Sequence, residues 1–286
     1  MINKLTLIGV GLIGGSFALA LREAGLVREV VGVGRSAENL SAALGMYVID
    51  SYTDAAQAVQ GADVVLLSVP VGQMGPMMAA IASHLAPHTI VSDVGSTKQD
   101  VVALARQHLS QHLAQFVPGH PIAGAEQSGV KAARGDLFRE RNVVVTPLTE
   151  TNPAAKETIT KLWQACGAKV SEMTPTLHDE VFAAVSHLPH LLAFGLVDYI
   201  AAQPNAHALF GFAASGFRDF TRIAGSSPEM WRDICLANRD ALLQQLAGYE
   251  GELARIKHLI EQGDGVALAE LFGRARDARQ TYLKAS

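Results

Sequence analysis

The sequence predicts an α/β fold in which an N-terminal Rossmann-type dinucleotide-binding domain is followed by an all-α domain. Short β-branched runs alternate with amphipathic stretches over roughly the first 170 residues, which is typical of parallel strands joined by crossover helices. The strand signal fades after Thr174 and Pro175, and the rest of the chain has helical spacing. We therefore expect one domain over residues 1–173 and a second over residues 174–286.

Composition limits the class of protein and its partners. The 286 residues are 49% hydrophobic and 17% charged, which suits a large buried core. A net charge of −4 argues against general electrostatic binding to nucleic acid or to a membrane surface. The two cysteines, Cys166 and Cys235, form no CxxC pair, so we expect neither a disulfide scaffold nor thiolate-bound zinc, and a cytoplasmic location fits best. The apolar run Leu5–Leu21 resembles a signal peptide, but its glycines favour a strand, turn and helix.

Individual elements of the first domain follow from the same periodicity. We expect strands at Leu5–Ile8, Val30–Val33, Val64–Val69, Thr89–Ser92, Gln115–Val117 and Asn142–Thr146. The clearest helical patterns are Gly14–Ala24, Met74–His84, Thr97–His112 and Ala154–Cys166, the last with Pro153 in its first turn.

Two long helices dominate the predicted second domain. The first, Leu177–Ala202, contains Pro189, which removes a backbone donor and should kink the helix. The second begins with Ser227 as N-cap and Pro228 at the first helical position, and a run to about Glu261 would make it roughly 50 Å long. Apolar residues on more than one face predict a homodimer built through this domain.

A glycine-rich turn after the first strand indicates a dinucleotide site. The motif GxGxxG lies between a predicted strand and a predicted helix, where glycines let the backbone approach a pyrophosphate and the helix offers its first amides to the anion. The alternative is a tight turn that binds nothing. We assign the cofactor site to Gly9, Gly11, Leu12, Ile13 and Gly14, together with Ser68 and Pro70.

The end of the second strand bears on the choice between NAD and NADP. An acidic residue there usually binds the free ribose hydroxyl of NAD, but this chain has Arg35 and Ser36. Both residues suit a 2′-phosphate, so residue type favours NADP somewhat over NAD. A solvated surface arginine is the alternative.

Two loops beyond later strands supply candidates for chemistry at the nicotinamide end. Ser96 and Lys98 follow the fourth strand, although Ser96 with Gln99 also matches a capping box. His120 lies between Gly119 and Pro121, which indicates an extended turn at the same end of the sheet. A neutral imidazole there can take the proton that oxidation of an alcohol releases.

The helical domain offers a second group of polar residues. His187 and His190 lie one turn apart beside Pro189, and because no third metal ligand stands out, we expect them to line a pocket rather than bind a metal. Arg222 or Arg218 suits a substrate carboxylate, while an ion pair to Asp219 or Asp233 is the alternative.

Several motifs together resemble the prephenate and arogenate dehydrogenase family of tyrosine biosynthesis over nearly the whole chain. They are GVGLIGGS, DVGSTK, GHPIAGAEQSG, VSHLPH and GFRDFTRIA, the last leading to Trp231. The resemblance implies oxidative decarboxylation of prephenate or arogenate to 4-hydroxyphenylpyruvate or tyrosine, with hydride transfer to NAD or NADP. It implies that His120 bonds the ring hydroxyl with Ser96 beside it. Substrate binding would involve Arg222, His187, His190, Trp231 and Glu126, with Glu126 organising the pocket.

The resemblance also sets expectations about neighbouring domains and rival activities. The chain leaves no room for a fused mutase domain or for a C-terminal regulatory domain. A β-hydroxyacid dehydrogenase is the nearest enzymatic alternative, but it would need a lysine in the helical half, and Leu177–Ala202 contains none. A non-catalytic NADP-binding redox sensor is a third reading. The preference between prephenate and arogenate stays open.

Overall fold

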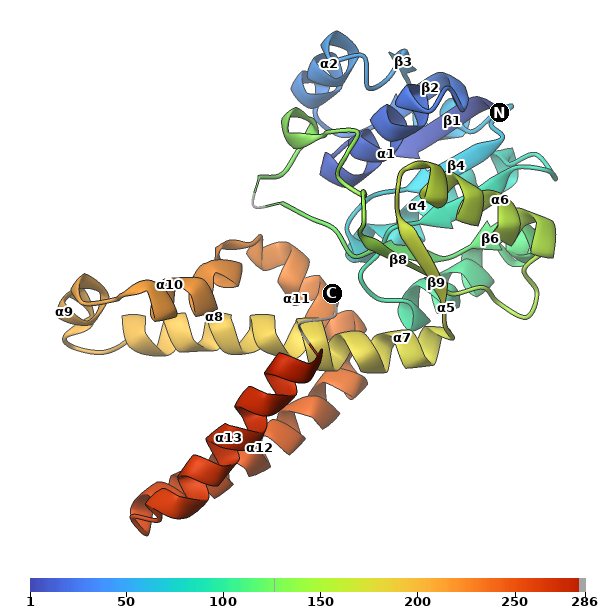
Figure 1. Ribbon diagram of the computed structural model, residues 1–286. Helices are drawn as coiled ribbons and strands as arrows, with labels where there is room; N and C mark the ends of the chain where they lie inside the picture. The colour runs from blue at the N-terminus through green and yellow to red at the C-terminus, as the bar shows by residue number, and fades with distance from the viewer. Residues whose placement is uncertain (126, 283–286) are drawn as a thin grey trace. The chain divides into compact units, whose positions relative to one another are not determined.

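The computed structural model describes residues 1–125 and 127–282, and they divide into two compact units between Arg239 and Asp240. The first unit contains a six-stranded parallel sheet in the order β3-β2-β1-β4-β5-β6 (Figure 1). This is the Rossmann strand order, so the predicted α/β fold is confirmed. The strands are β1 (Ile2–Ile8), β2 (Val27–Val33), β3 (Ser51–Tyr52), β4 (Val64–Leu67), β5 (Ile90–Asp93) and β6 (Phe116–Val117).

Helices cover both faces of this sheet because its central strands are apolar on both sides. On one face Leu66 packs in a core with Phe17 of α1 (Leu12–Glu23) and Trp163 of α6 (Pro153–Ala165). On the other face Val65 packs with the apolar sides of α4 (Met74–Ile81) and α5 (Gln99–His108). Two short helices complete this part of the unit, α2 (Ala37–Gly45) and α3 (Ala55–Ala58).

The start of α6 agrees with the local sequence signals. The Asn152 side chain accepts a hydrogen bond from the Ala154 amide at 2.9 Å, so α6 begins at Pro153 as predicted. The ends were predicted less well. The α4 and α5 helices stop at Ile81 and His108 and continue as 3-10 turns, where the sequence indicated helices to His84 and His112.

A second sheet holds the segment around His120, and here the prediction of parallel strands is wrong. Strand β7 (Gly119–Pro121) pairs antiparallel with β8 (Asn142–Val145), which pairs parallel with β9 (Lys169–Glu172). His120 therefore lies opposite Val144 on a short strand and not in a free turn. Pro118 separates β6 from β7, and because proline has no amide to donate, the chain leaves the first sheet there.

The first long helix of the predicted helical domain is interrupted where the sequence indicated a kink. It consists of α7 (Pro175–Phe182), a π-helical turn over Ala183–His187 and α8 (Leu188–Ala201), with Pro189 in the first turn of α8. The stretch Pro175–Ala201 is, among the described residues, the one helix long and apolar enough to cross a membrane. Only 22% of its apolar window is buried.

The prediction of one long helix from Ser227 to about Glu261 is wrong, because the helix is interrupted at Asn238. Ser227 caps α11 (Pro228–Ala237) by accepting from the Met230 amide at 3.3 Å, as expected. The helix ends there because the buried Asn238 side chain donates to the Asp179 carbonyl at 2.8 Å. Helix α12 (Arg239–Glu261) then starts afresh, and two short helices precede α11, namely α9 (Ala206–Gly211) and α10 (Ser215–Thr221).

The second unit is built from the body of α12 and from α13 (Gly265–Tyr282). Among the residues described in this unit, only Leu242 and Leu271 are buried, while several large apolar side chains are exposed. These are Leu243, Leu253, Ile260, Val266 and Phe272. Exposed apolar surface of this kind is typical of a protein interface.

Candidate active site

The glycine turn after β1 is shaped by close contact with the end of β4. Gly9 has a φ of +97°, and a Cβ there would lie 2.4 Å from the Ser68 carbonyl oxygen. A Cβ at Gly14 would lie 2.4 Å from the Ser68 Oγ, which itself donates to the Gly9 carbonyl at 2.5 Å. Around Gly11, by contrast, a Cβ would meet nothing within 4 Å. The turn is closely packed on one side and open at Gly11.

These features fit the pyrophosphate of a dinucleotide. Gly11 is the N-cap of α1 and supplies no capping side chain, so the amides of Leu12 and Ile13 are available to an anion. The turn lies between β1 and β4, where the strand order reverses and such sheets bind nucleotides.

The other predicted cofactor residues lie at neighbouring strand ends. Arg35 and Ser36 are exposed after β2, and the Ser36 hydroxyl caps α2 by accepting from the Asn39 amide at 3.2 Å. Pro70 is exposed beyond β4.

Because Gly14 is closely packed and Gly11 is open, we expect different outcomes when each is replaced by alanine. Gly14→Ala is expected to destabilise the protein by about 1–3 kcal/mol, because its Cβ overlaps atoms of Ser68, the residue after β4, and of Gly9 in the turn. Gly11→Ala is expected to keep the wild-type Tm but to weaken dinucleotide binding, because its methyl group occupies the open side. Thermal unfolding and cofactor titration of both variants test this difference. Equal loss of Tm in both would contradict it.

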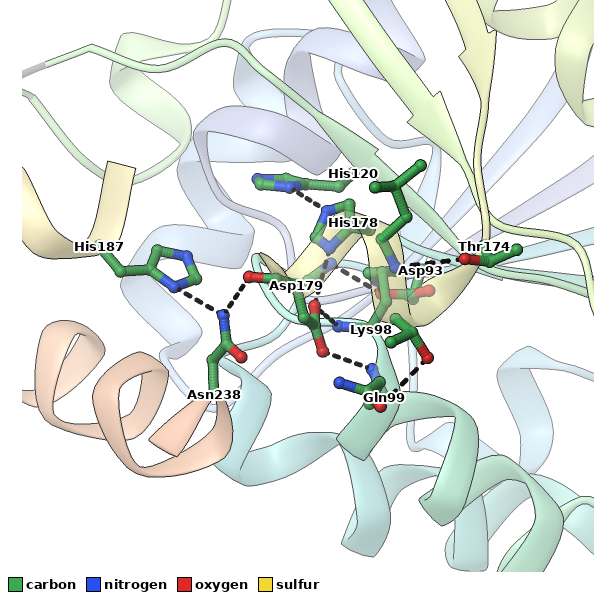
Figure 2. A network of polar contacts seen from close by, with 12 residues as sticks. Asp93, Lys98, Gln99, His120, Thr174, His178, Asp179, His187 and Asn238 are labelled. Atoms are coloured by element: carbon green, nitrogen blue, oxygen red, sulfur yellow. Dashed lines mark hydrogen bonds and ion pairs between the residues drawn. The ribbon is translucent and has the colours of Figure 1, made fainter. Parts of the chain in front are cut away.

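His120 lies at the carboxyl edge of the main sheet, at the start of a chain of hydrogen-bonded side chains (Figure 2). The Gly119 amide donates to the Asp93 carboxylate at 3.2 Å, which ties β7 to the end of β5. His120 Nδ1 lies 2.9 Å from His178 Nε2, and His178 Nδ1 lies 2.8 Å from Asp179 Oδ1. His178 and Asp179 belong to α7 and are almost fully buried, while His120 is half-buried.

Asp179 also caps α5. The predicted capping box of Ser96 and Gln99 is therefore wrong. Its carboxylate accepts the Lys98 amide at 2.8 Å and the Gln99 amide at 2.9 Å. Helix α5 begins at Gln99 and has no capping side chain of its own, so Ser96 does not act as its N-cap. The capping group comes from a residue about eighty positions further along the chain, which local sequence cannot indicate.

Lys98 was expected beside the nicotinamide end of the cofactor site. Its side chain is instead buried. Its ammonium group pairs with the Asp93 carboxylate, and both side chains are fully buried. Asp93 also accepts the Gly95 amide at 2.7 Å. The pair therefore fixes the loop after β5 against the start of β7, next to His120.

The surroundings of the two linked histidines keep both rings neutral. Burial lowers the pKa of His120 well below its ordinary value, and the charges of His178, Lys98 and His187 act in the same direction. Burial also lowers the pKa of His178, against the opposing effect of Asp179. A neutral His120 can accept a proton at physiological pH.

A second group of predicted residues gathers around Trp231 of α11. The His190 ring stacks on Trp231 at 3.7 Å between centroids, and the His187 ring meets its edge at 6.1 Å. His187 is buried, which lowers its pKa to about 4. Burial lowers the pKa of His190, and the nearby charge of Arg222 adds to this effect. The rings of His187, His190 and Trp231 therefore lie together, and Arg222 is near enough for its charge to act on His190.

Asn238 connects the two groups. Its amide donates to the Asp179 carbonyl and lies 3.1 Å from His187 Nδ1 (Figure 2). A hydrogen bond to the Ser96 backbone also acts on His187, which brings Ser96 to the same place. Asp179 and Asn238 were not predicted as site residues, because their role depends on contacts between distant segments.

Two further expectations concern residues or groups outside this network. Glu126 lies outside the described residues, so its predicted role stays a prediction. Among the described residues, no three or more His, Cys, Asp or Glu side chains form a group that could hold a metal ion. Of the acids offered as ion-pair partners for Arg218 or Arg222, Asp233 pairs with Arg232 at 2.7 Å.

A glycine turn that fits a dinucleotide and a neutral imidazole at the same edge of the sheet are what oxidation of an alcohol requires. The fold and the site thus define an NAD(P)-dependent dehydrogenase. Two family models match most of the chain. A model of the prephenate dehydrogenase nucleotide-binding domain matches residues 17–172, and one of the prephenate dehydrogenase dimerization domain matches residues 174–274. The chain belongs to the prephenate dehydrogenase family.

Individual relatives agree over nearly the whole chain. Prephenate dehydrogenase of Bacillus subtilis is 40% identical over 98% of this chain and 76% of its own length. The structure of prephenate dehydrogenase from Aquifex aeolicus in complex with hydroxyphenyl propionate and NAD+ is 34% identical, with a TM-score of 0.91 and coverage of 98% of both chains. Synechocystis arogenate dehydrogenase is 30% identical, with a TM-score of 0.82 and coverage of 98% and 99%.

Proposed function

We propose that the protein oxidatively decarboxylates prephenate or arogenate, using NAD or NADP, with His120 as the catalytic base. The observation that carries this proposal is the half-buried, neutral His120 at the carboxyl edge of a dinucleotide-binding sheet. Membership of the prephenate dehydrogenase family supplies the substrate class. We place the substrate-binding domain at residues 174–286, after a dinucleotide domain at residues 1–173.

His120 handles a single proton twice in this scheme. The substrate is a cyclohexadienol with a carboxylate opposite its hydroxyl group. The bound dinucleotide supplies an acceptor for the hydride of the carbinol carbon. As that hydride leaves, His120 takes the hydroxyl proton, which produces a dienone. Cleavage of the bond to the carboxylate then releases carbon dioxide, and its electron pair makes the ring aromatic and the oxygen a phenolate. His120 returns its proton to that oxygen.

The remaining site residues would orient the substrate. We assign recognition of a carboxylate to Arg222, whose charge acts on His190, the ring stacked on Trp231. Ser96, His187 and Glu126 complete the proposed pocket. Because aromatisation drives the reaction, the protein chiefly has to hold the ring in place and polarise one oxygen.

Arg222→Gln is expected to weaken substrate binding. Loss of a hydrogen-bonded ion pair to a carboxylate costs about 1.5–3 kcal/mol, which corresponds to roughly a 10- to 150-fold increase in KM. Steady-state kinetics with prephenate and with arogenate measure this effect, and kcat should change much less. An unchanged KM for both substrates would remove Arg222 from the carboxylate site.

The pH dependence of the reaction should reflect the environment of His120. Because burial lowers the pKa of His120, the neutral base persists as the pH falls through the ordinary histidine range. Activity is lost only when the pH falls through the lowered pKa. The acid limb of the kcat/KM profile is therefore expected below about pH 6.5, the reference value. An acid limb above that value would contradict a neutral His120 as the base.

The cofactor preference rests on Arg35 and Ser36. Their residue types favour NADP slightly, whereas the Aquifex aeolicus relative is described with NAD+. An assay that offers each cofactor at equal concentration decides between them. A strong preference for NAD would return Arg35 to a solvated surface role.

We further propose a cytoplasmic homodimer formed through the helical domain. The apolar stretch Pro175–Ala201 carries the hydrogen-bonded His178 and Asp179, which would be costly inside a bilayer. Its exposed apolar surface, and that of α12 and α13, suits a second copy of the chain. Sedimentation analysis tests this assembly.

The direct test of function offers prephenate, arogenate or a simple β-hydroxyacid with NAD or NADP, and follows the absorbance of the reduced cofactor. The proposal expects turnover with prephenate or arogenate. Turnover only with the hydroxyacid would identify a β-hydroxyacid dehydrogenase. Cofactor binding without turnover on any substrate would identify a redox sensor.

A further inference from the structure

We propose that His178, oriented by Asp179, is a positioning residue that holds His120 in the tautomer with its proton on Nδ1. This leaves His120 Nε2 with the lone pair that takes the substrate's hydroxyl proton. The inference rests on the proposed function, in which His120 is the base. It assigns a specific task to two buried residues of α7 that lie behind His120.

Asp179 is ionised. Burial alone would raise the pKa of Asp179, but hydrogen bonds from His178 and from the Gln99 and Lys98 amides lower it below its ordinary value. A carboxylate can only accept hydrogen bonds. Because His178 Nδ1 lies 2.8 Å from Asp179 Oδ1, the His178 proton must be on Nδ1.

The tautomer of His120 follows from that of His178. A neutral imidazole with its proton on Nδ1 has a lone pair on Nε2. His178 Nε2 lies 2.9 Å from His120 Nδ1, so His120 Nδ1 must be the donor of this hydrogen bond. The lone pair of His120 is then on Nε2, for which the structure gives no hydrogen-bond partner within the described residues.

Packing fixes the geometry of the hydrogen-bonded residues His120, His178 and Asp179 before the substrate binds. The His178 ring lies against Phe182 at 4.5 Å between centroids, and His120 contacts the same phenyl ring at 4.9 Å. Asp179 is held by the two amides of α5. Asn238 also fixes the backbone of Asp179. Neither His178 nor Asp179 is exposed enough to exchange its partner for water.

Burial favours the neutral state of both rings, although two carboxylates face His178. His178, Lys98 and His187 face His120, while Asp179, Asp93 and Lys98 face His178. Protonation of His178 would place a second proton on its Nε2, which would then donate to His120 Nδ1. His120 would have to carry its own proton on Nε2 and could not act as a base. Burial and the Lys98 charge oppose that protonation.

Two substitutions of His178 separate positioning from packing. His178→Phe keeps an aromatic ring against Phe182 but gives His120 Nδ1 no acceptor. His178→Gln supplies an amide oxygen that can accept from His120 Nδ1 and an NH2 group that can donate to Asp179. The phenylalanine variant is expected to lose about 10- to 100-fold in kcat with KM nearly unchanged. The glutamine variant should recover most of that loss.

A double-mutant cycle provides the decisive comparison. In a His120→Asn background no base remains to be oriented, so His178→Phe should change kcat by less than about threefold. His112→Phe is the matched control, because His112 is half-buried and bonds the Thr89 carbonyl away from this network. It should leave kcat unchanged. An equal loss from His178→Phe in both backgrounds, or a glutamine variant as impaired as the phenylalanine variant, would overturn the proposal.

A second measurement does not depend on turnover. Nitrogen NMR of the full-length protein labelled at histidine distinguishes protonated from lone-pair ring nitrogens, and the His120→Asn and His178→Gln variants assign the two rings. The proposal expects the proton on Nδ1 of both. A proton on Nε2 of His120 would overturn it. If the wild-type protein oxidises neither prephenate nor arogenate, the proposed function fails, while the NMR result still decides the tautomer.

Discussion

His120→Asn is expected to lower turnover about 10²- to 10⁴-fold, the usual contribution of a positioned base. Asparagine cannot take up the hydroxyl proton, so hydride removal would have to build up a protonated carbonyl. The glycine turn that fits the dinucleotide connects β1 to α1, whereas His120 belongs to β7. The dissociation constant for the cofactor should therefore stay close to that of the wild type.

Single-turnover kinetics and cofactor titration measure the two effects separately. His112→Phe again serves as a control, because it removes a histidine outside the network. If His120→Asn keeps most of the wild-type rate, His120 is not the base. If it loses cofactor affinity to the same degree as turnover, the loss reflects a distorted site.

Lys98→Met is expected to give the largest loss of stability, about 3–5 kcal/mol in the free energy of unfolding. The change removes the partner of Asp93, whose carboxylate is fully buried between the loop after β5 and the start of β7. The two amides of Gly95 and Gly119 remain, but the negative charge loses its counterion. Denaturant unfolding at fixed protein concentration measures the effect.

Two controls show whether burial is the cause. Lys156→Met breaks an ion pair to Glu172 whose two side chains are 35% and 52% exposed, so it should cost less than about 1 kcal/mol. Adding Asp93→Asn to Lys98→Met removes the uncompensated charge and should restore part of the stability. A loss from Lys98→Met no larger than that from Lys156→Met would contradict a structural role for the buried pair.

Much of the fold follows from local signals in the sequence. The glycine turn, the Pro153 helix start and the Ser227 cap each depend on residues within one helical turn. Propensity and periodicity act over the same range, so these features were predicted correctly. The interruption near Pro189 was also predicted, because proline removes a backbone donor wherever it occurs in a helix.

The features that were missed depend on contacts between distant segments. Strand β7 has only three residues, too few for an alternating pattern, and it exists because β8 pairs with it. The break at Asn238 occurs because its side chain bonds Asp179 on another helix. Without that contact, the sequence from Ser227 onward has the spacing of one continuous helix.

The candidate site shows the same division. His120, His187, His190 and Trp231 were singled out from motifs, and Asp179 and Asn238 connect His120 to the other three through His178 and His187. The burial of Lys98 and the double role of Asp179 were not predictable, because a residue's type does not reveal its partner. The sequence therefore indicates candidate side chains for the site, while tertiary contacts determine their partners, protonation and hydrogen bonding.

The most direct test is a crystal structure with dinucleotide and a substrate analogue that keeps the ring hydroxyl but cannot lose carbon dioxide. The account predicts that His120 Nε2 lies about 2.6–3.2 Å from that hydroxyl, with His120 Nδ1 still bonded to His178. It would be contradicted by a His120 ring turned toward solvent, or by a hydroxyl group bonded to another side chain.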